Sequence, residues 1–419
     1  MGRTRSGTYR VLRAIGPGVI TGAADDDPSG IATYSIAGAQ FGTALLWTAL
    51  LTWPMMAAVQ MVCARIGLVT GRGLAGTLKQ RFPKWLLIIF VCALLIANTI
   101  NIAADLAGMA DAAQMLTGIN SRWYIAIFVV IISWTTVKLP YRRFADVLKW
   151  LVVVLFAYPI TAFIVRVNWF EVVRSTLLPS LPHSRAEWST LVAILGTTIS
   201  PYLFFWQTSA EIEEEIDAGQ KTLKQRKGAS PEEISASRID VTLGTLFSNV
   251  VMFFIIVTTA ATLNRHGITH IATTHDAAEA LRPLAGNFAA LLFTVGVVGV
   301  GLLAIPTLAG SAAYAFADTF KWKQGLGRTF DRARAFYSVI LLSTIGAAVL
   351  TFTNLDPVRA LYWSAVINGL LSPFVLLTIL IVAIDAKLMH GQPASYIGWL
   401  AVAFTTAAMF AAGIAMFVV

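Results

Sequence analysis

Long apolar segments recur along almost the whole chain, and the charged residues gather in the short stretches between them. A helix needs about 20 mostly apolar residues to cross a bilayer. Segments of this kind lie at 14–37, 43–66, 85–116, 122–138, 145–166, 189–213, 239–263, 286–318, 335–354, 358–385 and 394–418. The pattern predicts an all-α membrane protein in which residues 1–419 form one transmembrane domain of about eleven helices.

The composition supports this prediction. Hydrophobic residues make up 57% of the chain and charged residues 13%, whereas soluble domains are about 45–50% apolar and about 25% charged. The net charge of +9 resides in loops, so we expect a lipid bilayer and no nucleic acid as the partner of this surface. Cys63 and Cys92 lie in apolar segments, which favours neither a disulfide framework nor a zinc site.

Lysine and arginine are concentrated in alternate loops, for example around Arg72, Lys149, Lys224 and Arg328. Loops of this kind stay on the cytoplasmic side of a membrane. We therefore expect a cytoplasmic N-terminus and, because the number of spans is odd, an external C-terminus, in the inner (plasma) membrane of a bacterium. The longest polar insert, residues 211–238, is expected to be a solvated cytoplasmic loop with room for a short amphipathic helix.

The first predicted span carries three consecutive aspartates, Asp25, Asp26 and Asp27, directly before Pro28. Each carboxylate at mid-span costs roughly 2.5–3.5 kcal/mol on insertion scales, and a proline inside a helix removes a backbone hydrogen bond. We therefore expect this span to unwind near Asp27 and to leave backbone carbonyls free beside it.

The sixth predicted span also has a proline near its middle, Pro201. Interruptions at corresponding places in the two halves of a transporter point to a binding site at the bilayer midplane. The positions of the two interrupted spans predict a first inverted repeat at 14–166, a second at 189–385 and an additional span at 394–418. The alternative is that Pro28 and Pro201 only kink two continuous helices.

Several motifs resemble those of the NRAMP family of divalent-metal transporters, and the resemblance covers essentially the whole chain. The residues that carry it are Gly16-Pro17-Gly18, Ala37-Gly38-Ala39-Gln40-Phe41-Gly42, Leu46-Trp47, Gln60, Ala64-Arg65-Ile66-Gly67, Thr70-Gly71 and Ala104-Asp105-Leu106-Ala107. The resemblance implies a LeuT-type five-plus-five inverted repeat with discontinuous helices 1 and 6. It also implies a transporter and not an enzyme.

The departures from the family pattern bear on the substrate. The family's first-span Asp-Pro-Gly-Asn keeps its metal-binding aspartate as Asp27, but Gly30 replaces the asparagine. In the sixth span the family's Met-Pro-His-Asn is replaced by residues 200–203, Ser-Pro-Tyr-Leu, and Gln207 stands where a second histidine is expected. A third-span acidic pair is reduced to Asp105. This set of losses resembles the NRAMP-related magnesium transporters, a branch without proton coupling.

The candidate ligands that remain are all oxygen atoms, which suit Mg²⁺, Ca²⁺ and Mn²⁺ better than soft metals. Asp27 supplies charge, freed carbonyls of Ala24 and Thr197 face the same cavity, and Ser200 and Gln207 supply neutral oxygens. The full set of candidate metal-site residues is Asp27, Gly30, Ala24, Thr197, Ser200, Gln207, Asn368 and Asp105. Mg²⁺ usually keeps several waters, and the small Gly30 and Ser200 leave room for them. We therefore expect Mg²⁺ or Mn²⁺ as transported substrate, and no cofactor.

We expect the transport to run downhill without protons, because all the histidines fall in loop segments: His183, His266, His270, His275 and His390. Within the class, the alternative is a proton-coupled Mn²⁺/Fe²⁺ symporter. A second alternative is a transporter of another solute, such as an amino acid, on the same architecture. A membrane-embedded enzyme is disfavoured because the chain has no His-Glu-x-x-His or Gly-x-Ser-x-Gly motif. A sensor or a channel stays open on sequence grounds.

Overall fold

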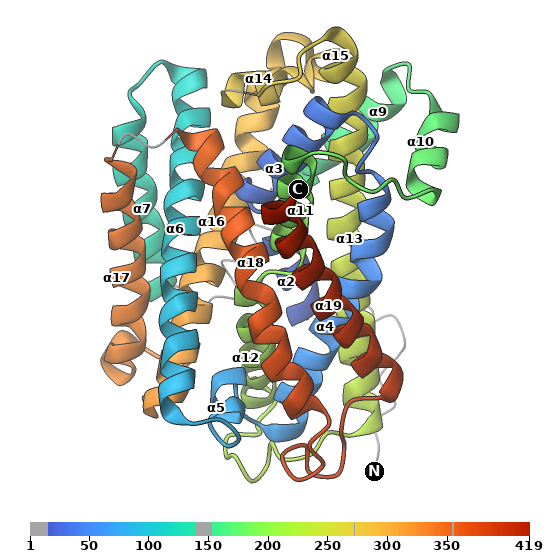
Figure 1. Ribbon diagram of the computed structural model, residues 1–419. Coiled ribbons are helices and arrows are strands. Elements are labelled where there is room, and N and C mark those ends of the chain that lie inside the picture. The colour runs from blue at the N-terminus through green and yellow to red at the C-terminus, as the bar shows by residue number, and fades with distance from the viewer. Residues whose placement is uncertain (1–15, 139–152, 272, 354–355) are drawn as a thin grey trace, which may run out of the picture.

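The computed structural model describes residues 16–138, 153–271, 273–353 and 356–419 (Figure 1). The regular structure in these ranges is entirely helical. Its α-helices are α2 (Pro17–Asp25), α3 (Pro28–Phe41), α4 (Trp47–Thr70), α5 (Leu74–Leu78), α6 (Lys84–Thr117), α7 (Ser121–Lys138), α9 (Ala157–Ile164), α10 (Trp169–Leu177), α11 (Arg185–Thr198), α12 (Pro201–Asp217), α13 (Pro231–Thr262), α14 (Thr274–Glu279), α15 (Arg282–Ala285), α16 (Ala289–Phe320), α17 (Arg334–Thr351), α18 (Pro357–Ala383) and α19 (Tyr396–Val418).

Within the described ranges, eight helices or broken helix pairs are long and apolar enough to cross a membrane, and each matches a predicted span. The other three predicted segments differ for separate reasons. Segment 14–37 is divided between α2 and α3, and α7 is a helix of 18 residues with a basic side chain near each end. Segment 145–166 lies partly outside the described residues, and its visible part, α9, bends by 118° into α10. The full number of spans therefore stays a prediction.

Both predicted interruptions are present. Pro28 begins α3 and Pro201 begins α12, so each proline occupies the first turn of a new helix. That position suits proline because its missing N–H would have no helical partner there. The backbone between the halves is not helical, with Asp27 and Ser200 both extended. The alternative of two kinked but continuous helices is therefore wrong.

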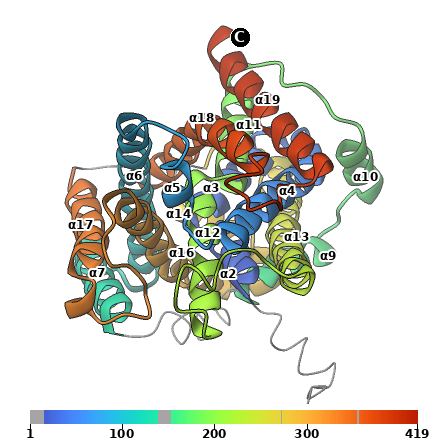
Figure 2. The same ribbon diagram turned by 90° about the horizontal axis from the view of Figure 1, so that it is seen from below.

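The two broken helices run in opposite directions through the centre of the molecule. α3 lies above α2 in Figure 1, whereas the chain descends from α11 to α12. α2 contacts α12, and α3 contacts α11. α4, α6, α13, α16 and α18 surround this pair, and α7 and α10 lie at the periphery in Figure 2. Non-helical backbone at membrane depth survives only where protein or a water-filled cavity surrounds it, and this arrangement supplies the protein.

The polar insert at 211–238 is mostly helix, which corrects the expected long loop. α12 continues to Asp217 and α13 begins at Pro231, so only residues 218–230 connect them. The sequence Ser230-Pro231-Glu232-Glu233 explains the early start of α13. The Ser230 and Glu233 side chains form a reciprocal capping box around a proline in the first turn, and that combination stabilises a helix N-terminus.

The carboxylate of Asp240, on α13, holds the start of α2. It accepts hydrogen bonds from the backbone N–H groups of Gly16 (2.9 Å), Gly18 (2.6 Å) and Val19 (3.3 Å). These donors have no partner within α2 because the first N–H groups of any helix are unsatisfied. A short helix that is only nine residues long thereby gains a cap from a neighbouring helix.

Glycine allows α2 and α13 to approach closely. A methyl group at Gly22 would collide with the backbone of Gly244, including its carbonyl oxygen. Because the Gly244 atoms that the methyl group would meet all belong to the backbone, they cannot move aside without shifting a helix.

We predict that Gly22→Ala destabilises the protein by about 1–3 kcal/mol, the usual cost of overpacking. Gly346→Ala is the matched control, because a methyl group at that helical position meets only Thr99, at 3.8 Å, and gains helix propensity. Tryptophan fluorescence during thermal unfolding in detergent measures both. An unfolding temperature for Gly22→Ala equal to that of the wild type would contradict the packing argument.

Candidate metal site at the two helix breaks

Asp27 is fixed at the first break by the start of α3. It is the N-cap residue, and its Oδ1 accepts from the Gly30 backbone N–H (2.8 Å) and from the Ser29 hydroxyl (2.6 Å). An aspartate at this position satisfies an otherwise unpaired N–H and lies at the positive end of the helix dipole. The sequence Asp-Pro-Ser-Gly thus holds the carboxylate by its own local backbone, and leaves Oδ2 for other helices.

The side chain of Asn101, on α6, connects Asp27 to two other predicted site residues. Its Nδ2 donates to Asp27 Oδ2 (3.0 Å) and to Asp105 Oδ2 (3.1 Å), and its Oδ1 accepts from Asn368 on α18 (3.2 Å). Asp27, Asp105 and Asn368 therefore share one buried network. The Asn368 Oδ1 atom is buried and has no hydrogen-bond partner among the described residues, so it is an available oxygen.

The second break places Ser200 differently from the expectation. Its hydroxyl does not cap α12. It donates back to the carbonyls of Gly196 and Thr197, the latter at 2.9 Å. Ser372 of α18 donates to the carbonyl of Ile199 (2.5 Å). The carbonyls of Gly196, Thr197 and Ile199 at this break therefore already have hydroxyl partners from nearby side chains.

Two tyrosines join the breaks to one another. Tyr202, in the first turn of α12, donates its hydroxyl to the carbonyl of Ala24 (3.0 Å), and the Tyr34 hydroxyl lies 2.8 Å from Thr197 Oγ1. The Ala24 carbonyl is therefore occupied by a phenol in this conformation. Ala24 and Thr197 thus each contact a tyrosine that belongs to the other break, and a metal site shared by their carbonyls stays a prediction.

The other two aspartates of the first break face α13. Ser248 donates to Asp25 Oδ2 (2.5 Å) and lies 3.2 Å from Asp26 Oδ1. Asp25 Oδ1 and Asp26 Oδ2 are buried without a hydrogen-bond partner in the described part of the chain. Two further acceptor atoms are thus left unsatisfied close to Asp27, where each costs free energy unless a cation or a proton is present.

Gln207 does not join the Asp27 network. It lies two turns into α12, where its Oε1 accepts from Thr21 (2.6 Å) and its Nε2 donates to Glu211 (3.0 Å). Glu211 also accepts from Ser237 on α13 (2.6 Å). These contacts tie α2, α12 and α13 together on the side of the breaks toward α5, and Gln207 has its hydrogen bonds there and not at Asp27.

The electrostatics of the breaks favour a cation. Asp25, Asp26, Asp27 and Asp105 are at most 3% exposed, and no described lysine or arginine forms an ion pair with them. Buried charges are normally paired or bound to metal. No group of three or more His, Cys, Asp or Glu side chains in the described ranges could hold a metal ion by itself. Neutral oxygens or water must therefore complete the coordination of any bound ion.

Sequence reasoning missed Ser248, which contacts the carboxylates of Asp25 and Asp26, and the two tyrosines that join the breaks, Tyr34 and Tyr202. Nothing in a single sequence pairs a hydroxyl with a carboxylate, a carbonyl or another hydroxyl more than a hundred positions away. Asn101 gave a usable signal, because it precedes Asp105 by one helical turn and so shares its face. Asn98, three residues before Asn101, donates instead to the Leu308 carbonyl and to Ser311 on α16.

Residues 18–419 match the family described as Natural resistance-associated macrophage protein-like, abbreviated Nramp. The chain belongs to the Nramp family. As an Nramp protein it is a divalent-metal transporter and not an enzyme.

Solved structures share the fold of this Nramp protein. A manganese transporter from Eremococcus coleocola, in complex with an aromatic bis-isothiourea substituted compound, superposes with a TM-score of 0.76 at 18% identity, over 99% of this chain and 89% of that one. Mhp1, a nucleobase-cation-symport-1 transporter, gives 0.58 at 16% identity over 99% and 93%. MhsT in complex with L-phenylalanine gives 0.59 at 15% over 96% and 97%. At these identities the likeness shows the LeuT-type fold alone.

We predict that Asn101→Leu weakens Mn²⁺ binding by roughly 10–100-fold, the usual effect of removing a residue that orients a metal ligand. Asn98→Leu is the matched control, because it removes a buried asparagine from the same helix without touching Asp27. Isothermal titration calorimetry on detergent-purified protein measures both affinities. Equal losses in the two variants would mean that α6 packing, and not the Asp27 contact, controls affinity.

Proposed function

We propose that this Nramp protein takes up Mg²⁺, and also Mn²⁺, by alternating access at a midplane site built around Asp27. The observation that carries the proposal is the chemistry of the network that joins the two breaks. Its side chains offer carboxylate, amide and hydroxyl oxygens and no thioether or imidazole. Oxygen donors suit hard cations such as Mg²⁺ and Mn²⁺.

We propose that Asp27 supplies the charged ligand, with Asp105, Asn368 and Ser200 contributing directly or through water. The carbonyls of Ala24 and Thr197 become ligands in a state where the Tyr202 and Ser200 hydroxyls release them. Gly30 leaves room beside the carboxylate, because a side chain there would begin 3.6 Å from Asp27 Oδ1. Gln207 contributes through the neighbouring hydrogen-bond network of α2 and α12, where its amide contacts Thr21 and Glu211. Room for water favours Mg²⁺, which dehydrates reluctantly.

We propose that no proton accompanies the metal. His183, His266, His270, His275 and His390 lie outside the long helices, so no histidine is placed to relay protons beside the breaks. A divalent ion gains roughly 4.6 kcal/mol per 100 mV of membrane potential, twice the single-charge value. The competing function is proton-coupled symport of Mn²⁺ or Fe²⁺, which the unpaired acceptor atoms of Asp25 and Asp26 favour because they can take up protons.

The membrane orientation is part of the proposal. Arg72, Lys79 and Arg81 flank α5, and further basic residues lie in 218–230 and 321–334, all at the lower end of Figure 1. Basic loops face the cytoplasm, so this end is cytoplasmic in a bacterial inner membrane, the N-terminus is inside and the C-terminus outside. We further propose that 14–166 and 189–385 are inverted repeats, with 394–418 as an additional span.

We predict that Asp27→Ala reduces uptake of both Mg²⁺ and Mn²⁺ into proteoliposomes by at least about tenfold, because it removes the charged ligand. Asp331→Ala is the control, since the Asp331 side chain is 80% exposed far from the breaks. Ion-sensitive dyes inside the vesicles report both ions. Wild-type vesicles that carry Mn²⁺ but exclude excess Mg²⁺ would rule out the magnesium assignment.

We also predict that metal entry is not coupled to proton movement. With a pH-sensitive dye in the lumen, the wild-type protein is expected to leave lumenal pH unchanged while Mg²⁺ enters, because the site contains no histidine relay. A membrane potential set by potassium and valinomycin should accelerate the uptake, since two charges move. Acidification in step with metal entry would establish the symporter in place of the uncoupled mechanism.

A further inference from the structure

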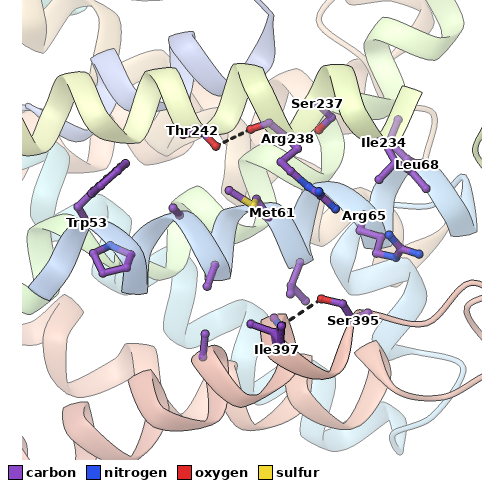
Figure 3. Close-up of a pocket in the computed structure, with 17 residues that line it drawn as sticks. Trp53, Met61, Arg65, Leu68, Ile234, Ser237, Arg238, Thr242, Ser395 and Ile397 are labelled. Atoms are coloured by element: carbon purple, nitrogen blue, oxygen red, sulfur yellow. Dashed lines mark hydrogen bonds between the residues drawn. The ribbon is translucent and has the colours of Figure 1, made fainter. Parts of the chain in front are cut away.

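A groove of about 540 Å³ lies between α4, α13 and α19, away from the Asp27 network (Figure 3). Trp53 and Met61 line its α4 side, and Ile397, which is 81% exposed, lines its α19 side. Most of the remaining wall consists of alanine, glycine and aliphatic side chains. Small residues leave a hollow on a membrane-facing surface, and lipid is the molecule available to fill it.

Two arginines lie at one end of this groove. Arg65 of α4 and Arg238 of α13 lie toward the end opposite Trp53 in Figure 3. Arg65 Nε donates to the Gln392 carbonyl (3.1 Å), which anchors the side chain beside the start of α19. The two guanidinium groups repel one another, and neither forms an ion pair within the described residues. Paired cations without a carboxylate favour an anion between them.

The dimensions of the groove fit one leaflet of a bilayer. Trp53 and Arg65 are twelve residues apart on one helix, or about 18 Å at 1.5 Å per residue. Half of a hydrocarbon core is about 15 Å thick. An occupant with a charged head at Arg65 and a tail that reaches Trp53 therefore has the length of a phospholipid.

The arginine end also has the right position along the membrane normal. α4 leads directly into α5 with its basic neighbours, and α13 follows the basic connection 218–230. Basic residues at a membrane surface attract anionic lipids, at about 1 kcal/mol for each Lys or Arg. The head group is thus drawn to the same end where Arg65 and Arg238 lie.

We propose that this groove binds one anionic phospholipid, with its phosphate between Arg65 and Arg238 and one acyl chain along the apolar wall toward Trp53. The bound lipid joins α4, α13 and α19. On α13 it lies beside Ser237, whose hydroxyl holds Glu211 in the α2–α12–α13 contacts.

Native mass spectrometry of the full-length protein in detergent tests the proposal, with titrations of phosphatidylglycerol and phosphatidylcholine of matched chains. The wild type is expected to bind phosphatidylglycerol preferentially. The double variant Arg65→Gln/Arg238→Gln should bind it about 25-fold more weakly, roughly fivefold for each arginine. The matched control Arg81→Gln/Arg332→Gln, which removes the same charge from exposed positions, should bind like the wild type.

Two further measurements distinguish binding in the groove from general electrostatic attraction of the lipid to the protein surface. Ala58→Leu/Ala401→Leu fills the wall without changing charge and should also weaken phosphatidylglycerol binding, whereas inorganic phosphate at the same concentration should not displace the lipid. Thermal unfolding without lipid verifies that each variant is folded. The proposal is overturned if the two arginine double variants lose affinity equally, if phosphatidylcholine binds as tightly, or if phosphate displaces the lipid. Lipid binding is measured without metal, so its outcome is independent of the transport proposal.

Discussion

The carboxylate of Asp27 must be held inside a membrane protein without a basic partner, and much of the central architecture follows from that constraint. The break before Pro28 supplies two donors from α3 itself, Ser29 and Gly30, and Asn101 supplies a third from α6. A continuous helix could not offer the Gly30 N–H, because that group would already be paired within the helix. The break is thus the structural means by which a charge is placed at this depth.

The same constraint explains how the two broken helices depend on one another. Tyr202 from the second break satisfies a carbonyl of the first, and Tyr34 after the first break reaches Thr197 before the second. Contacts of this kind hold both breaks closed around the aspartates, which are at most 3% exposed. Alternating access requires that such contacts form and separate in turn, and single hydrogen bonds, each worth about 1 kcal/mol, suit that purpose.

The fold was largely predictable because its signals are local: long apolar runs, a proline after each break, and an acidic cluster at one of them. The position of Asp27 followed from the same cluster. The partners of the freed carbonyls were not predictable, since Tyr202 and Ser372 reach them from helices whose packing no single sequence specifies. Gln207 was expected at the ion because of its place along the sixth span, but its amide pairs with Thr21 and Glu211. The helical continuation of α12 to Asp217 was also missed, because charge was taken as a sign of loop.

The central claim is that a divalent cation binds at Asp27 between the two breaks, and anomalous diffraction from crystals of the intact protein soaked in Mn²⁺ tests it most directly. The account predicts one strong anomalous peak about 2.2 Å from an Asp27 carboxylate oxygen, the distance typical of an oxygen-bound divalent metal. Its remaining neighbours should be oxygens from α2, α6, α11, α12 or α18, or waters. A peak bound elsewhere, with the Asp27 carboxylate still paired only to Ser29, Gly30 and Asn101, would contradict it.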